Sequence, residues 1–131
     1  MSTEVKTQLG TEKYLMNISA GKNQIIADEP IAKGGQEKGF NPYELLASSL
    51  SACTAATVKI FADRREWALD EVEVKVVFED KTAEGHALFK KYITLHGNLD
   101  EDQKATLMKA AHACPVQKIL TSEIAVEAEL V

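Results

Sequence analysis

The two cysteines are the residues of this sequence whose chemistry is most specific. Cys53 lies within an uncharged run between Glu44 and Lys59, and Cys114 directly precedes Pro115. A thiolate can attack a peroxide and become a sulfenic acid, with which a second thiol condenses to form a disulfide. Two cysteines can equally pack as small hydrophobic side chains, because free cysteine is among the most buried residue types. The spacing of the two residues along the chain leaves both interpretations open.

The other candidate motifs each lack a feature that their chemistry requires. His112 and Cys114 stand close together, but three histidines and two cysteines, thinly spread, do not supply a tetrahedral metal site. The three serines just before Cys53 lack the glycines and the strand–turn–helix setting of a nucleophile elbow. Gly34-Gly35 lacks the spacing and the Lys-Ser/Thr ending of a phosphate-binding loop. We therefore expect no metal and no cofactor.

The composition describes an ordinary globular chain of 131 residues with a net charge of −5. A hydrophobic content of 45% and a charged content of 27% are typical of a soluble protein. The acidic balance argues against nucleic-acid binding, which normally uses a basic patch. The polar start, MSTEVKTQLG, does not resemble a signal peptide. The sequence predicts one cytoplasmic domain over residues 1–131, with neither a nucleic acid nor a membrane as its partner.

A long helix is expected to hold Cys53, within the stretch from Phe40 to Trp67. Asn41 can cap its start, and Pro42 suits its first turn. The uncharged run is shorter than the roughly 20 residues of a membrane span, so we interpret it as a buried core helix. Apolar residues cover more of its circumference than a one-sided helix requires, which predicts packing against a second copy of the chain.

Strands are expected on both sides of this helix. Three short candidates precede it, Val5–Leu9, Tyr14–Ile18 and Gln24–Ala27, and a polar loop over residues 28–39 leads into the helix. After the helix, apolar residues alternate from Val72 to Phe78, which predicts a strand with one buried face. Leu88–His96 is its expected antiparallel partner, although its alternation is less regular.

The final third of the chain predicts two more helices and a strand. Asp100 is expected to cap the first of them, with Gln103 completing a capping box. This helix should turn its apolar residues inward and end at Cys114, because a proline restricts the residue before it. The inward residues are Leu107, Met108 and Ala111. A short helix, Pro115–Leu120, and a last alternating strand, Ile124–Leu130, complete the order βββ-α-ββ-αα-β.

Two segments resemble the cysteine motifs of one protein family. GFNPYELLASSLSACTAATVKIFADRREW, which contains Cys53, is similar to the first-cysteine helix of the OsmC/Ohr family of osmotically inducible and organic-hydroperoxide-resistance proteins. HACPVQKIL, which contains Cys114, resembles the second-cysteine motif of that family. The expected element order fits along essentially the whole chain. The resemblance implies an α+β fold, with antiparallel sheets packed on a long central helix, in an intertwined homodimer.

The resemblance also implies an activity. Members of the family are cytosolic thiol peroxidases, which implies a cysteine-dependent reduction of organic hydroperoxides in oxidative stress defence. Cys53 would be the peroxidatic residue and Cys114 the resolving residue. An external dithiol would then reduce the disulfide. The partners implied are a second copy of the chain, a small organic hydroperoxide and this dithiol.

The chain departs from the family pattern at the start of the central helix. The better-known peroxidases have a glutamate directly after the Asn-Pro, where this chain has Tyr43, with Glu44 next to it. They also pair the thiolate with an arginine from the N-terminal half, whereas this chain has none before Arg64. We therefore identify a variant subgroup and expect a substitute positive charge, oriented by Glu44. The candidates are Lys22, Lys33, Lys38, Arg64 and Arg65.

A second function remains open because the glutamate–arginine pair is missing. A buried thiol without a nearby positive charge has a raised pKa and reacts slowly. The alternative is a dimeric small-molecule-binding module of the same fold, without peroxidase turnover. Consumption of peroxide in the presence of a dithiol distinguishes the two functions.

Overall fold

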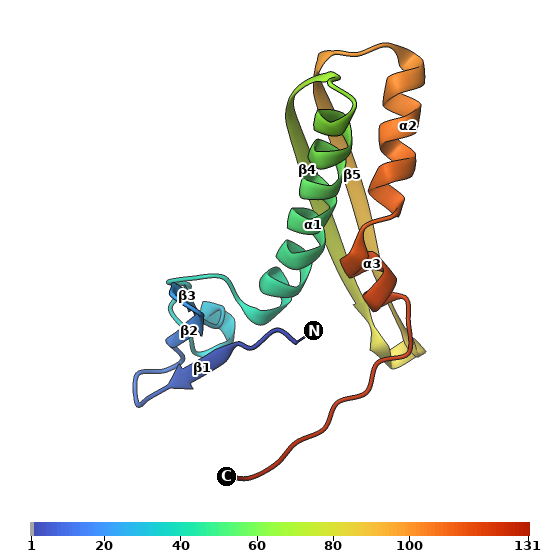
Figure 1. Ribbon diagram of the computed structural model, residues 1–131. Coiled ribbons are helices and arrows are strands. Elements are labelled where there is room, and N and C mark those ends of the chain that lie inside the picture. Colours follow the sequence, from blue (N-terminus) through green and yellow to red (C-terminus); the bar gives the residue numbers. More distant parts are fainter. Residues whose placement is uncertain (1) are drawn as a thin grey trace. The chain divides into compact units, whose positions relative to one another are not determined.

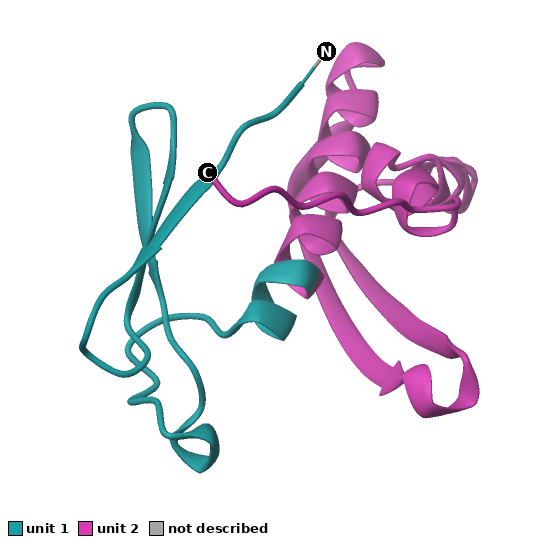
Figure 2. Cartoon of the chain, turned by 90° about the horizontal axis from the view of Figure 1, so that it is seen from below, with its two compact units in different colours: residues 1–46 teal, residues 47–131 magenta. Residues whose placement is uncertain are grey.

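The chain folds into two compact units, which a computed structural model describes for residues 2–131. The first unit extends to Leu46 and the second runs from Ala47 to Val131 (Figure 2). One long helix, α1 (Pro42–Arg64), begins in the first unit and continues into the second. The expectation of a single domain over residues 1–131 stays a prediction.

A three-stranded antiparallel sheet forms the first unit. Its strands are β1 (Lys6–Leu9), β2 (Met16–Ala20) and β3 (Asn23–Ala27), in the order β1-β2-β3 (Figure 1). All three expected strands are confirmed, although β2 begins two residues later than expected. Gly21, at φ +60°, lies in the tight turn between β2 and β3, where glycine adopts positive φ without a steric penalty.

The loop after β3 is organised around one buried carboxylate. Asp28 is fully buried and accepts backbone hydrogen bonds from Glu29 at 2.8 Å, Lys38 at 3.2 Å, Gln36 at 3.3 Å and Tyr14 at 3.4 Å. Burial raises the pKa of Asp28, but these backbone hydrogen bonds outweigh it and hold the pKa below its usual value. These hydrogen bonds hold the loop in one conformation although it has no apolar periodicity. The loop contains a short 3-10 turn, η1 (Ile31–Lys33).

Helix α1 begins at a reciprocal capping box. The backbone N–H of Glu44 donates to the side-chain oxygen of Asn41 at 2.9 Å, and the Asn41 N–H donates to Glu44 Oε1 at 2.9 Å. Pro42 occupies the first helical position, where its missing N–H is not needed. The expected cap and first turn are therefore confirmed.

A long hairpin follows α1 in the second unit. Strands β4 (Ala68–Lys81) and β5 (His86–Asn98) pair antiparallel around a 3-10 turn, η2 (Thr82–Glu84). Val74 lies opposite Ile93 and Val72 opposite Leu95, so the apolar residues of both strands share one face. Both strands are longer than expected, because cross-strand hydrogen bonds extend beyond the alternating residues.

Two helices complete the second unit beside this hairpin (Figure 1). Helix α2 (Glu101–His112) starts at the expected capping box of Asp100 and Gln103, and α3 (Pro115–Leu120) follows directly after Cys114. The core joins α1, β4 and α2. Its buried residues are Val58, Ala62, Leu69, Leu107 and Ala111.

Two sequence-based expectations are wrong. Met108 is 39% exposed, and Ala110 takes the inward position beside Leu107 instead. Among the described residues, Ile124–Leu130 forms no strand, and Val126 is 89% exposed. Alternation alone does not make a strand, because the backbone also needs a hydrogen-bonding neighbour, and within this chain the segment has none.

We expect the Asp28→Asn variant to have a lower midpoint of thermal unfolding at neutral pH, because an amide replaces the charge that four N–H groups favour. Since the folded-state pKa is lowered, the contribution of Asp28 is complete above its unfolded-state value of 3.8 and is lost as the pH falls through the folded value. Thermal melts between neutral pH and pH about 3 measure this difference.

The Asp70→Asn variant provides the control, because Asp70 is an exposed carboxylate of β4. Equal melting midpoints for the Asp28 and Asp70 variants at neutral pH would contradict the role of Asp28.

Candidate functional site

Cys53 lies near the middle of α1, among small residues that let other chain segments approach closely. The side chain of Cys53 is partly buried, and that of the next residue, Thr54, is fully buried. The helix therefore presents a thiol and a hydroxyl side by side in the second unit.

Cys114 lies at the break between α2 and α3. Pro115 is the first residue of α3, and Cys114 before it has an extended conformation, with φ −61° and ψ 127°. The Cys114 side chain is 0% exposed. Pro115 thus separates α2 from α3 at Cys114, whose thiol is buried in the second unit.

The structure brings the two thiols together. The side chains of Cys53 and Cys114 lie close enough for each thiol to shift the pKa of the other, and both are free thiols. Burial raises the pKa of Cys53, and the hydrogen bond with Cys114 raises it further. The two sulfurs are therefore placed to exchange a proton or to form a bond.

The pKa of Cys114 moves in the opposite direction. Burial raises this pKa, but the hydrogen bond with Cys53 and weaker contributions from the Gln117 N–H and the Thr54 hydroxyl outweigh burial and lower it. Gln117 lies in the first turn of α3, and a backbone N–H group near a sulfur favours the anionic form of that sulfur. The donors around Cys114 therefore favour the anionic form of that sulfur.

Lys91 supplies a positive charge next to this pair. Its Nζ donates to Thr54 Oγ1 at 3.1 Å and to the carbonyl oxygen of Ala111 at 2.8 Å. Burial lowers the pKa of Lys91, while the negative charges of Cys114 and Cys53 act to raise it. The second unit thus contains a cation that interacts electrostatically with both thiols.

Sequence analysis did not select Lys91, although a signal for it exists. Phe89, Lys91, Ile93 and Leu95 follow one another at every second position of β5, and all four are partly buried. Lys91 is therefore a charged residue on the apolar face of β5, and it interrupts the alternation of apolar and polar residues in this strand. Such a residue requires a buried partner.

Three of the five positive charges that the sequence suggested have other partners. The ammonium group of Lys33 lies 5.5 Å from the ring centroid of Tyr43, and that of Lys38 pairs with Glu12 at 3.2 Å. The guanidinium of Arg65 stacks 3.7 Å from the ring centroid of Phe61. Within one chain, these interactions direct the three side chains to groups other than the thiols.

A cavity of about 440 Å³ lies in the second unit, and two residues that act on the thiol pair line it. Lys91 and Gln117, which both interact with Cys114, form part of its wall, together with His112. Most of the remaining lining is apolar, and none of its described lining residues is acidic. The apolar lining residues are Leu50, Ala87, Leu88, Phe89 and Leu120. The cavity therefore suits an apolar small molecule.

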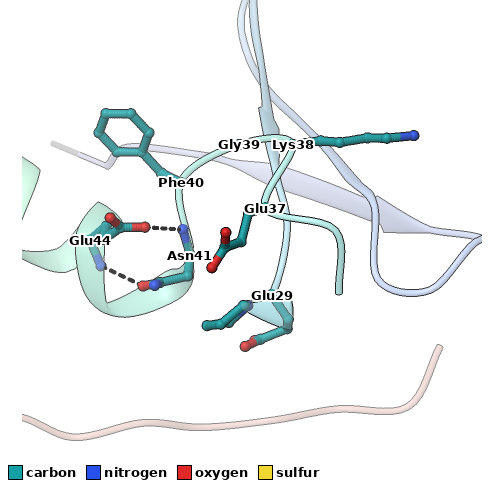
Figure 3. A pocket seen from close by; sticks show the side chains of 8 residues that line it. Glu29, Glu37, Lys38, Gly39, Phe40, Asn41 and Glu44 are labelled. Atoms are coloured by element: carbon teal, nitrogen blue, oxygen red, sulfur yellow. Dashed lines mark hydrogen bonds between the residues drawn. The ribbon is translucent and has the colours of Figure 1, made fainter. Parts of the chain in front are cut away.

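A second cavity, of about 500 Å³, lies in the first unit at the start of α1 (Figure 3). Three carboxylates line it, from Glu29, Glu37 and Glu44, together with Lys38. Figure 3 shows the capping hydrogen bonds between Glu44 and Asn41 in its wall. Among residues 2–131, no group of three or more His, Cys, Asp or Glu side chains is arranged to hold a metal ion.

Comparison with known proteins places this arrangement in a family. The family described as OsmC-like protein matches residues 35–129, a span that contains both cysteines. The chain belongs to the OsmC-like family. No curated protein matches it.

Solved structures of OsmC-like proteins share the fold. An osmotic stress induced and detoxification response protein from Psychrobacter arcticus 273-4 matches with a TM-score of 0.77 and 24% identity, over 91% of this chain and 88% of that chain. An OsmC-like protein from Mycoplasma pneumoniae matches with a TM-score of 0.75 and 21% identity, over 92% and 87%. The organic hydroperoxide resistance protein OhrB of Bacillus subtilis matches with a TM-score of 0.62 and 22% identity, over 92% and 91%. The expected mixed fold, antiparallel sheets with a central helix, is confirmed.

Glu44 is the residue of the predicted site that the chain itself does not bring to the thiols. It precedes Cys53 by nine residues in α1, so the two side chains leave the helix on opposite sides, about 13.5 Å apart along its axis. Its observed role within the chain is to cap the start of α1. An orienting role for Glu44 at the thiols of an OsmC-like dimer stays a prediction.

The central helix is also the one described segment long and apolar enough to cross a membrane by length and composition. It has 23 residues and a mean hydropathy of 1.5 in its most apolar stretch. The helix passes this test because it extends on both sides beyond the uncharged run, which alone is too short. The core helix of a soluble protein passes the same test, and α1 contributes Val58 and Ala62 to the core.

We expect a mild thiol oxidant to link Cys53 and Cys114 within one chain, because hydrogen-bonded thiols need little movement to reach the Cα separation of roughly 4.4–6.8 Å that a disulfide requires. Free-thiol titration and non-reducing mass spectrometry of protease digests measure the product. The Cys53→Ser and Cys114→Ser variants are the matched controls. A disulfide that forms mainly between chains would show that the two sulfurs do not meet as described.

Proposed function

We propose that this OsmC-like protein is a thiol peroxidase that reduces small organic hydroperoxides. The observation that carries the proposal is the interaction between the Cys53 and Cys114 thiols, and Lys91 and Gln117, which act on Cys114, also line a mostly apolar cavity of about 440 Å³. Similarity of the fold to organic hydroperoxide resistance proteins supports it. A role in oxidative stress defence in the cytoplasm follows from this activity.

Cys53 would attack the peroxide, because it is the more accessible thiol. Cys114 is fully buried, whereas Cys53 is partly exposed. Attack of the Cys53 sulfur on the distal peroxide oxygen releases an alcohol and leaves a sulfenic acid. Cys114 then attacks the oxidised sulfur and forms a disulfide, with loss of water. The cycle closes when an external dithiol reduces this disulfide by exchange.

A second candidate function is a small-molecule-binding module without turnover. The raised pKa of Cys53 favours it, because burial leaves less of the nucleophilic thiolate at neutral pH. The same cavity would then hold an apolar ligand, and the thiols would pack inside the second unit without turnover. Tyr43, in place of the usual glutamate, is consistent with this function.

We expect the purified protein to consume cumene hydroperoxide when a dithiol is present, and the Cys53→Ser variant to fall to the uncatalysed rate. The Cys114→Ser variant should perform a single oxidation and then stop, because no resolving thiol remains. Peroxide consumption and sulfenic-acid trapping distinguish the two variants. Equal rates for the wild type and Cys53→Ser would remove the peroxidase function and leave the binding module.

The surface of α1 supports a homodimer as the functional form. Only 22% of its most apolar 18-residue stretch is buried within one chain, and Ile60 is 49% exposed. The C-terminal segment adds further exposed apolar side chains, such as Leu130. A single chain rarely leaves so much apolar surface in contact with water, so we propose that a second copy covers it.

We expect sedimentation equilibrium to give a dimer at micromolar concentration, and the Ile60→Glu variant to weaken dimerisation by about tenfold or more, because it places an unpaired charge in an apolar interface. The Lys109→Glu variant introduces an acidic residue at an exposed position of α2 and provides the control. A wild-type monomer at this concentration would contradict the dimer.

A further inference from the structure

We propose that Lys91 and Thr54 form a hydrogen-bond relay that holds the resting negative charge of the thiol pair on Cys114, so that Cys114 acts as the base for Cys53. The base step rests on the proposed peroxidase function, whereas the location of the charge does not. Lys91 and Thr54 are positioning residues, since they act on the substrate only through the sulfurs.

The direction of the relay follows from its donors and acceptors. The ammonium of Lys91 has protons but no lone pair, so it donates to Thr54 Oγ1 at 3.1 Å. The Thr54 hydroxyl, already accepting from Lys91, has its single proton left to donate toward Cys114, whose pKa it lowers. Every proton in this chain points toward the Cys114 sulfur, which favours a thiolate there.

Burial makes the relay effective. Thr54 and Cys114 are both fully buried, where hydrogen bonds and charges interact more strongly than in water. Lys91 is fixed by a second hydrogen bond, to the Ala111 carbonyl near the C-terminus of α2, where a helix favours a cation. The lysine is therefore held in place from two helices rather than free to turn toward solvent.

The remaining ionisable groups around the pair do not oppose this assignment. Cys53 reaches Cys114 from α1, and Lys91 reaches the pair through Thr54 from β5. His112, at the end of α2, lines the same cavity as Lys91, and none of the described lining residues is acidic. The lowered pKa of Cys114 and the raised pKa of Cys53 agree with the relay.

The relay assigns each proton and electron pair of the reaction. Cys114 thiolate takes the proton of Cys53 as the Cys53 sulfur bonds to the distal oxygen of the hydroperoxide and the O–O bond breaks. The leaving alkoxide takes that proton and departs as an alcohol, which restores the Cys114 thiolate. This thiolate attacks the Cys53 sulfenic acid and the S–O bond breaks. The hydroxide that leaves becomes water by taking up, from the buffer, the proton that Cys114 released when it ionised. Two electrons pass from the sulfurs to the peroxide.

The test is a pH titration of thiolate absorbance at about 240 nm in the reduced protein without peroxide. We expect Cys53→Ser to keep the low-pH thiolate, since serine still donates a hydrogen bond, and Cys114→Ser to lose it. Lys91→Met and Thr54→Val should each raise the midpoint by about one pH unit or more. The conservative variants Lys91→Arg and Thr54→Ser should stay near the wild type.

Lys90→Met is the matched control, because Lys90 is the exposed neighbour on the other face of β5 and pairs with Glu79. A midpoint unchanged in Lys91→Met, or a low-pH thiolate that persists in Cys114→Ser but not in Cys53→Ser, overturns the proposal. If Lys91→Met does not fold, the comparison of Thr54→Val with Thr54→Ser decides alone. Peroxide turnover is measured separately, so a charged Cys114 without turnover rejects only the proposed function.

Discussion

A partly buried ammonium group sets the arrangement of the second unit. Lys91 lies on the apolar face of β5, and its Nζ is hydrogen-bonded to α1 through Thr54 and to α2 through Ala111. A charge in such a place is costly unless it is paired and hydrogen-bonded. The two helices meet this requirement only if they hold their positions beside the hairpin. The requirement that stabilises Lys91 therefore also fixes the segments that carry Cys53 and Cys114.

The first unit shows the same principle with the opposite charge. Asp28 is fully buried, and four backbone N–H groups satisfy its carboxylate. Three of these donors belong to the loop that follows Asp28, so the carboxylate replaces the backbone pairing that a strand or helix would provide. Gly35 belongs to this arrangement, because a Cβ there would collide with the backbone of Glu29. In each unit, one buried ionic group orders segments that lack a strong pattern of their own.

The features that the sequence predicted correctly are governed by local interactions. The cap at Asn41 and the capping box at Asp100 each join residues three positions apart, and the break at Pro115 follows from backbone sterics. The position of Lys91 could not be predicted in this way, because its partner Thr54 is 37 residues away. The failure at Ile124–Leu130 is of the same kind, since a strand depends on a neighbour that the pattern does not specify. Family motifs supplied the two cysteines, but not the charge beside them.

A reactive thiol site has two requirements that a single sulfur could not meet, and this site divides them between two sulfurs. A nucleophile must be accessible to its substrate, whereas a thiolate is stabilised most strongly by donors held in a site from which water is excluded. Cys53 is the partly exposed thiol, and Cys114 is the buried one with several donors. In the proposed relay, the charge on the buried sulfur acts on the accessible one without moving either residue far. This chain lacks the arginine and glutamate of the better-known peroxidases, and Lys91 of β5 would then supply the activating charge from within the second unit.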